Sequence, residues 1–223
     1  QEAADLALIS RRAAEDSETP FMCVQDGFLT THTVESLRLP EPELMKQFVG
    51  HPSEKIHNMF DPSRPLMVGV VQNQDSYKKG KIAQRHFYQQ VPGAVSEAMD
   101  EYYNLTGRRY RMVDPYLMDD AEYCLVGMGT MMETATTAAD YMRAEMGIKV
   151  GVVHVTSFRP FPGPELVEML QNVRGVSVFE RMDNPIAQSN PLTAELKAAF
   201  ADALNGMDGY PKVDRIPRIL SGS

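Results

Sequence analysis

The sequence predicts an α/β fold, and three observations support that class. After Ala121, short apolar runs alternate with longer amphipathic segments, as in strands joined by crossover helices. The 223 residues are enough for one large or two small domains. Hydrophobic residues make up 43% of the chain and charged residues 23%, a balance typical of a protein that buries a core. We place a domain boundary near Met118–Asp119 and expect one domain over residues 1–118 and a second over residues 119–223.

The first region is the less regular of the two. Its first expected elements are a helix in "EAADLALISRRAAED" and a buried strand in "PFMCVQDGF" that leads into a helix after the threonines. A short helix in "EPELMKQFVG", closed by Gly50, and a loop or broken helix in "HPSEKIHNMFDPSRP" are expected next. The region is expected to end with a second strand in "LMVGVVQNQDSY", a long helix from about Lys81 to Leu105 and a connector in "RRYRMVDPYLMDD".

The second region has a clearer pattern. Its expected elements are a strand in "EYCLVGMG", a helix in "TMMETATTAADYMRAEMG", a strand in "KVGVVHVTSF", a helix in "GPELVEMLQNV", a strand in "GVSVFER", a helix in "NPLTAELKAAFADALNG" and a strand in "PRILSG". Thr130 is expected to cap the first of these helices, with Glu133 three residues on and Gly147 as the stop. This alternation predicts a doubly wound parallel sheet.

Composition excludes several classes of function. The formal net charge of −8 argues against a nucleic-acid surface, which needs an excess of Lys and Arg. No segment approaches the about 20 apolar residues of a membrane span. Cys23 and Cys124 both lie in apolar runs, so we expect reduced core thiols and a cytoplasmic protein. Two cysteines are too few for an iron–sulfur cluster, and the five histidines show no metal-ligand spacing.

The two ends suggest that the sequence is a piece of a longer polypeptide. The chain begins at Gln1 inside a helical pattern, and it closes with "IPRILSGS", which is typical of a strand running into a loop. We therefore expect that a functional site could be completed by residues outside this sequence.

Two strand ends in the second region are candidate anion sites. "GMGTMM" (residues 127–132) follows a strand and opens a helix, but Met132 replaces the third glycine of the dinucleotide fingerprint. A turn that needs glycines for close packing is therefore favoured, although an anion could sit on that helix N-terminus. Arg159 ends the next strand. It either binds a phosphate or carboxylate of a ligand, or it is a structural arginine that bonds to loop carbonyls or to a neighbouring domain. The charges in "FERMDNP" are expected to pair with one another.

The third candidate is the turn in "DGFLTTH". Asp26 ends a predicted strand, and Thr30, Thr31 and Thr33 could each cap the helix expected to follow. Capping does not explain why Asp26 and His32 share this turn. We therefore predict that Asp26, Thr30, Thr31 and His32 face a composite cofactor-binding site or a domain interface.

The same residues resemble the pyruvate:ferredoxin oxidoreductases, large thiamine-dependent enzymes that act on 2-oxoacids. That family carries an Asp-Gly-Phe-Arg-Thr-Ser-His block after a helix that begins Gln-Glu, and here "QE" at the start and "DGFLTTH" stand in those places. Further matches, collinear over nearly the whole chain, are "VVQNQDSY" for Ala-Gln-Asn-Pro-Asp-Ile-Tyr, "LTGRRY" for Leu-Thr-Gly-Arg-Glu-Tyr, "GMGTMMETA" for a Gly-Ser-plus-Glu-Thr block, and "SFRPFP" for Tyr-Arg-Pro-Phe.

The resemblance implies a fold and an activity. Residues 1–118 would form the rear part of a pyrimidine-binding domain, which is a partial thiamine-diphosphate-fold layer. Residues 119–223 would resemble the transketolase C-terminal domain and run into the start of a next segment. Such enzymes decarboxylate a 2-oxoacid such as pyruvate with thiamine diphosphate and Mg²⁺, pass electrons through 4Fe–4S clusters to ferredoxin, and yield an acyl-CoA. The groups that hold these cofactors would belong to other domains or subunits, so this chain would be inactive by itself. The complete enzyme would be a homodimer.

Three positions depart from the family pattern. Leu29 stands where the family has Arg, Thr33 stands where it has Glu, and Gln74 replaces the Pro of the Asn-Pro-Asp turn. The first two changes remove two charges from one loop, which is expected to affect substrate choice. Two other readings of the chain stay open: a non-catalytic nucleotide- or anion-binding module acting at residues 127–130 and Arg159, and a structural dimerisation segment.

Overall fold

The computed structural model describes residues 1–28, 30–55 and 61–223, and the chain divides into two compact units. Unit 1 comprises residues 1–25 and 34–110, and unit 2 comprises residues 26–33 and 111–223. The chain is an α/β protein, as predicted, with the strands found in the described residues gathered in unit 2. No helix in the described ranges is both long and apolar enough to cross a membrane.

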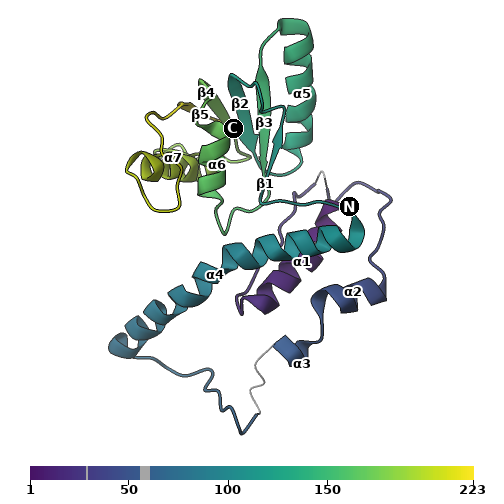
Figure 1. Ribbon diagram of the computed structural model, residues 1–223, viewed down its shortest axis with the longest axis vertical. Coiled ribbons are helices and arrows are strands. Elements are labelled where there is room, and N and C mark those ends of the chain that lie inside the picture. The colour runs from purple at the N-terminus through teal and green to yellow at the C-terminus, as the bar shows by residue number, and fades with distance from the viewer. Residues whose placement is uncertain (29, 56–60) are drawn as a thin grey trace. The chain divides into compact units, whose positions relative to one another are not determined.

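Unit 1 contains four helices among its described residues: α1 (Glu2–Asp16), α2 (Pro42–Val49), α3 (Pro52–Lys55) and α4 (Gln74–Thr106). Helix α1 lies along α4 (Figure 1) and both contact α2. The buried apolar side chains come from these three helices: Ile9, Ala13, Phe48, Val91, Val95, Ala98, Met99 and Tyr102. Gly50, with φ of 80°, ends α2 as predicted, whereas α4 begins seven residues before the predicted start at Lys81.

A buried carboxylate fixes the start of α1 to the end of α4. The Asp5 side chain is 0% exposed, and it accepts hydrogen bonds from Arg108 Nε at 2.6 Å and from the hydroxyls of Tyr102 and Tyr110, both at 2.8 Å. Gln1 Nε2 donates a further hydrogen bond at 2.8 Å. Burial by itself would raise the pKa of Asp5, but the hydrogen bonds, with that from Arg108 the largest, hold it below its usual 3.8.

Three predictions for unit 1 are wrong. Residues 21–26 and 66–73 are not strands, and residues 33–40 are not a helix. The first two segments are apolar, but no strand in the described part of the chain pairs with them. Met22, Val24 and Val71 are therefore 86%, 77% and 95% exposed. The third segment is short, ends at Pro40 and carries the β-branched Thr33 and Val34, so a helix without tertiary support is not stable there.

The two cysteines differ in environment. Both are free thiols, as predicted. Cys124 is buried in strand β2, and burial raises the pKa of its thiol. Cys23 is exposed, so the prediction of a core position is wrong for it. The reason is that the segment carrying Cys23 does not form the buried strand on which that prediction depended.

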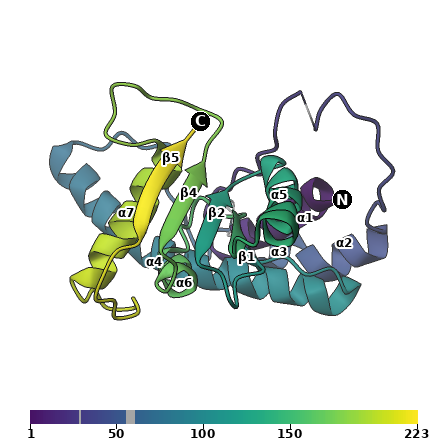
Figure 2. The same ribbon diagram turned by 90° about the horizontal axis from the view of Figure 1, so that it is seen from above.

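Unit 2 is built on a five-stranded sheet in the order β1-β3-β2-β4-β5. Its strands are β1 (Val113–Tyr116), β2 (Tyr123–Gly127), β3 (Val150–Val155), β4 (Gly175–Phe179) and β5 (Arg218–Gly222). Strands β2 to β5 are parallel, as predicted, and Figure 2 shows β2, β4 and β5 next to one another. The predicted connector is wrong at β1, which pairs antiparallel with β3 and makes the sheet mixed.

Helices cover both faces of this sheet (Figure 1). They are α5 (Met131–Met146), α6 (Gly163–Leu170) and α7 (Pro191–Leu204). Side chains of β3 alternate between the faces, because successive residues of a strand point to opposite sides. Val150 and Val152 pack with α5, while Val153 and Val155 belong to the larger cluster formed with α6 and α7. This double covering is the doubly wound arrangement that the sequence predicts.

Candidate functional site at the carboxyl edge of unit 2

The segments that follow β2 and β4 leave the sheet at the same edge. These strands are parallel neighbours, with Gly127 opposite Phe179. In open α/β sheets, ligands gather outside the carboxyl ends of the strands. The edge therefore carries the residues predicted as anion sites, and unit 2 adds the loop of residues 26–33 to it.

The glycines after β2 are required by close packing. A Cβ on Gly127 would lie 2.6 Å from Met132 Sδ and 3.0 Å from the carbonyl oxygen of Phe179. Gly129 has φ of 74°, and a Cβ there would lie 2.7 Å from Asp26 Oδ2. The predicted close-packing turn is confirmed, and the group packed against Gly129 is a carboxylate from a distant part of the chain.

Asp26 closes the N-terminus of α5. Its Oδ2 atom accepts hydrogen bonds from Thr130 N at 2.8 Å and from Thr130 Oγ1 at 2.6 Å. Arg181 Nη1 lies 4.0 Å from Asp26 Oδ1. The hydrogen bond from the Thr130 hydroxyl, then that from its amide, hold the pKa of Asp26 below its usual 3.8, and Arg181 acts in the same direction. The anion on this helix N-terminus is thus supplied by the chain itself.

Glu180 does the same at the N-terminus of α7. It accepts hydrogen bonds from Leu192 N at 2.7 Å, from Thr193 N at 3.0 Å and from Thr193 Oγ1 at 2.8 Å. The Thr193 side chain is fully buried. The prediction that the charges in "FERMDNP" pair with one another is therefore wrong for Glu180, which caps a helix, and Arg181 instead lies near Asp26.

Arg159 makes structural contacts. Its Nη1 donates to the Phe158 carbonyl at 2.8 Å, and its Nη2 donates to Glu195 Oε1 at 2.5 Å. The guanidinium also lies over the Phe158 ring at 4.3 Å from the centroid. Of the two predicted alternatives for Arg159, the structural one matches, since the guanidinium bonds to the Phe158 loop carbonyl and to Glu195 of α7. With Asp26 and Glu180 on the N-termini of α5 and α7, neither of these two helix N-termini is open to a nucleotide phosphate.

The structure separates the four predicted site residues into two groups. Asp26 contacts Thr130, whereas Thr31 and His32 contact each other through Thr31 Oγ1 and His32 Nδ1 at 2.9 Å. The His32 ring stacks on Phe28 with centroids 4.9 Å apart, and its backbone N–H donates to the Phe28 carbonyl at 2.9 Å. Thr30 is half-buried. None of these threonines caps the predicted helix, since that helix does not form. Leu29 lies outside the described residues.

Sequence reasoning missed the partners of the acidic residues. Thr130 was assigned to capping its own helix, but no side-chain capping bond of that kind is found for α5, and its hydroxyl binds Asp26. The two residues are 104 positions apart, so no local pattern joins them. Glu180 does carry a signal, because an acidic residue follows a strand shortly before an Asn-Pro helix start.

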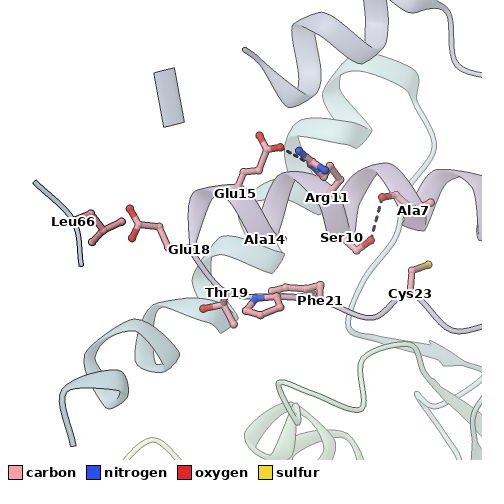
Figure 3. Close-up of a pocket in the computed structure, with 11 residues that line it drawn as sticks. Ala7, Ser10, Arg11, Ala14, Glu15, Glu18, Thr19, Phe21, Cys23 and Leu66 are labelled. Carbon is pink, nitrogen blue, oxygen red and sulfur yellow. Dashed lines mark hydrogen bonds and ion pairs between the residues drawn. The ribbon is translucent and has the colours of Figure 1, made fainter. Parts of the chain in front are cut away.

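Unit 1 holds a pocket of about 710 Å³ beside α1 (Figure 3). Its lining includes Arg11, Glu15, Phe21, Cys23 and Leu66. Glu15 is buried and pairs with Arg11 through Oε1, while its Oε2 has no hydrogen-bond partner among the described residues. No group of three or more His, Cys, Asp or Glu side chains that could hold a metal is found in the described residues.

Comparison with known proteins identifies both regions of the chain. Residues 1–100 match the family model described as "Pyruvate flavodoxin/ferredoxin oxidoreductase, thiamine diP-bdg", and residues 121–216 match "Pyruvate:ferredoxin oxidoreductase core domain II".

Relatives of two sizes match over most of the chain. A pyruvate-flavodoxin oxidoreductase of Trichormus variabilis is 32% identical over 216 residues, which is 96% of this chain and 18% of the relative. The pyruvate synthase subunit PorA of Thermotoga maritima is 34% identical over 202 residues, or 90% of this chain and 51% of the relative. A pyruvate:ferredoxin oxidoreductase of Moorella thermoacetica is 31% identical over 205 residues, which is 91% of this chain and 17% of the relative. The chain thus spans about half of the PorA subunit and less than a fifth of the larger relatives.

Proposed function

Because the chain belongs to the pyruvate:ferredoxin oxidoreductase family, we propose that it is a segment of an enzyme that decarboxylates a 2-oxoacid oxidatively. Pyruvate is the proposed substrate, the product is an acyl-CoA, and ferredoxin accepts the electrons. The observation that carries this proposal is the order of the two matched domains, with a thiamine-diphosphate-binding model at residues 1–100 followed by core domain II at residues 121–216.

The chain by itself is proposed to be inactive. Thiamine diphosphate supplies the carbanion chemistry of such enzymes when it is bound. A diphosphate and its Mg²⁺ need open helix N-termini or carboxylate clusters. At the carboxyl edge of unit 2, the N-termini of α5 and α7 are occupied by Asp26 and Glu180. These residues do not fit a diphosphate site, so we assign Mg²⁺, the 4Fe–4S clusters and the diphosphate to other domains or subunits.

The partners proposed for this chain are the remaining domains or subunits of a cytoplasmic, homodimeric enzyme. Unit 1 supports a large contact of this kind. Apolar residues of two extended segments lie in solvent, including Met22 at 86%, Met67 at 79% and Val71 at 95% exposure. Large exposed apolar patches mark interaction sites, so these segments are the surface proposed to contact the partner. A nearly continuous apolar run such as residues 66–71 is also typical of a strand covered on both faces.

The loop of residues 26–33 is proposed to form one wall of the composite site or domain interface. Thr31 and His32 are exposed, so their polar groups are free to face a partner domain or a bound molecule. The Phe28 stack and the Thr31 hydroxyl orient the His32 ring with Nδ1 toward the loop. That orientation leaves Nε2 of His32 as the ring atom directed away from Thr31.

The test measures CoA-dependent oxidation of pyruvate and other 2-oxoacids with a viologen dye as electron acceptor. The isolated chain and the complete parent polypeptide, with its partner subunits, are assayed in parallel. We expect activity and thiamine diphosphate binding in the complete protein and neither in the isolated chain. Failure of the complete protein in both assays would refute the oxidoreductase proposal. Activity of the isolated chain would refute the assignment of the cofactor groups to other domains.

The same material separates the two remaining alternatives. Calorimetric titration of the isolated chain with nucleotides and acyl-CoA tests the anion-binding module. Saturable nucleotide binding that Arg159→Ala abolishes would favour that module. Flat titrations, together with an inactive complete protein, would favour a structural dimerisation segment.

A further inference from the structure

We propose that Asp26 is a positioning residue, a latch that holds the loop of residues 26–33 on unit 2 by occupying the N-terminus of α5. In this role its carboxylate binds neither substrate nor cofactor. The inference refines the proposed site, and it rests on the proposed function only where catalytic activity is measured.

The geometry of the carboxylate supports a latch. Asp26 Oδ2 accepts from both the amide and the hydroxyl of Thr130, at 2.8 and 2.6 Å. The glycine at position 129 leaves the space that this oxygen occupies, since a Cβ there would approach it to 2.7 Å. The opposite oxygen lies 4.0 Å from Arg181 Nη1. A negative charge at a helix N-terminus is stabilised by the helix dipole and by the unpaired N–H groups of the first turn.

The course of the chain shows what the latch holds. Gln25 and Val34 belong to unit 1, whereas residues 26–33 between them belong to unit 2. Asp26 is the first residue of this loop, and its bonds to Thr130 join it to the turn after β2. The contacts that join Phe28 to His32 and Thr31 to His32 lie within the loop and give it shape. Shape comes from the loop itself, and we infer that its placement on unit 2 comes from Asp26.

A latch and a ligand-binding carboxylate respond differently to substitution. An asparagine at position 26 keeps an oxygen that can accept from the Thr130 amide, so a latch is retained in part. A carboxylate that transferred protons or held a metal would lose its function on the same substitution. Alanine removes the acceptor and also vacates the helix N-terminus, which a small carboxylate from solution can then enter.

The experiment is hydrogen exchange on the 223-residue chain in three variants: Asp26→Ala, Asp26→Asn and the control Asp183→Ala. Asp183 is an exposed acidic residue after the same strand, β4, that Glu180 follows. For Asp26→Ala we expect exchange at residues 27–33 and at the Thr130 amide to rise by about tenfold or more. Asp26→Asn should fall between that variant and the unsubstituted chain, and Asp183→Ala should match the unsubstituted chain. Sodium acetate, but not equal sodium chloride, should slow Thr130 exchange in Asp26→Ala only.

The exchange of α1 and α4 in unit 1 serves as the folding control. Unchanged exchange at residues 27–33 in Asp26→Ala would overturn the latch. So would exchange raised equally in both units, because the substitution would then have destabilised the whole chain. In the complete enzyme, Asp26→Asn should recover much of the activity that Asp26→Ala loses, and an equal loss in both variants would overturn a positioning role. If the complete protein oxidises no 2-oxoacid while the exchange pattern holds, the proposed function fails and the latch stands.

Discussion

The buried carboxylate of unit 1 provides the sharpest test of how this part of the chain is stabilised. Asp5→Ala removes a side chain that is 0% exposed and leaves four groups without this acceptor: the Gln1 amide, the Arg108 guanidinium and the hydroxyls of Tyr102 and Tyr110. Breaking a buried ion pair from one side costs about 3–5 kcal/mol. Arg108 is 28% exposed and regains some water, so we expect the lower end, about 3 kcal/mol.

The matched control is an exposed ion pair near the end of α4. Asp100 is 70% exposed and lies 3.5 Å from Arg109, the residue next to Arg108. Asp100→Ala should therefore change the free energy of unfolding by about 0–1 kcal/mol. Both variants replace an aspartate that contacts an arginine at the end of α4, and burial is the main difference between them.

The assay is urea unfolding of the 223-residue chain. Hydrogen exchange is the readout, measured separately in peptides from α1 and α4 and in peptides from the sheet of unit 2. Separate readouts are needed because the two units can unfold in separate transitions. Asp5→Ala should destabilise the α1 and α4 peptides and leave those of unit 2 unchanged. A loss below about 1 kcal/mol, equal to that of Asp100→Ala, would refute the claim that the buried cluster stabilises unit 1.

Three further predictions concern unit 2 and the thiols. Gly129→Ala should lower the free energy of unfolding by about 1–2 kcal/mol because of the positive φ, and its Cβ should also displace Asp26. Gly147→Ala, at a φ of 65° with no atom within 4 Å of the added Cβ, should lower it by the backbone strain alone. Hydrogen exchange at residues 27–33 should rise in the first variant only. The folded-state pKa of Asp26 lies below 3.8, because a hydroxyl and an amide donate to it, so its stabilisation is complete above that pH and is lost as the pH falls through the folded pKa. Acidification below about pH 4 should therefore raise exchange in the loop, and unchanged exchange down to pH 2 would contradict this. Cys23 should react with a thiol reagent in the folded chain at the rate of an exposed cysteine, while Cys124 reacts only after unfolding; equal rates would be inconsistent with the burial of Cys124.

The sheet of unit 2 was predictable because each of its strands and helices carries its own pattern. Alternating short apolar runs and amphipathic segments predict β2 to β5 and the three helices between them, and Gly147 marks the end of α5. The exception is β1. Its "VDPY" contains Pro115, which cannot donate a ladder hydrogen bond, so the sequence does not indicate a strand there. Proline is tolerated there because β1 is an edge strand.

Unit 1 shows the limit of the same reasoning. Residues 21–26 and 66–73 have the composition of buried strands, but a strand exists only when another strand satisfies its backbone groups. Their composition therefore predicts burial, but in the described part of the chain no partner strand pairs with them.

The sequence by itself determined the α/β class, the elements of the sheet of unit 2 other than β1, and the family, because all three are carried by local patterns and by blocks of residues in order. It also drew attention to Asp26, since an aspartate and a histidine in one turn exceed what capping needs. Only the tertiary structure decided what Asp26 does. Its partner Thr130 is 104 residues away, and such a pairing depends on how the loop packs against the sheet edge, which no local spacing records.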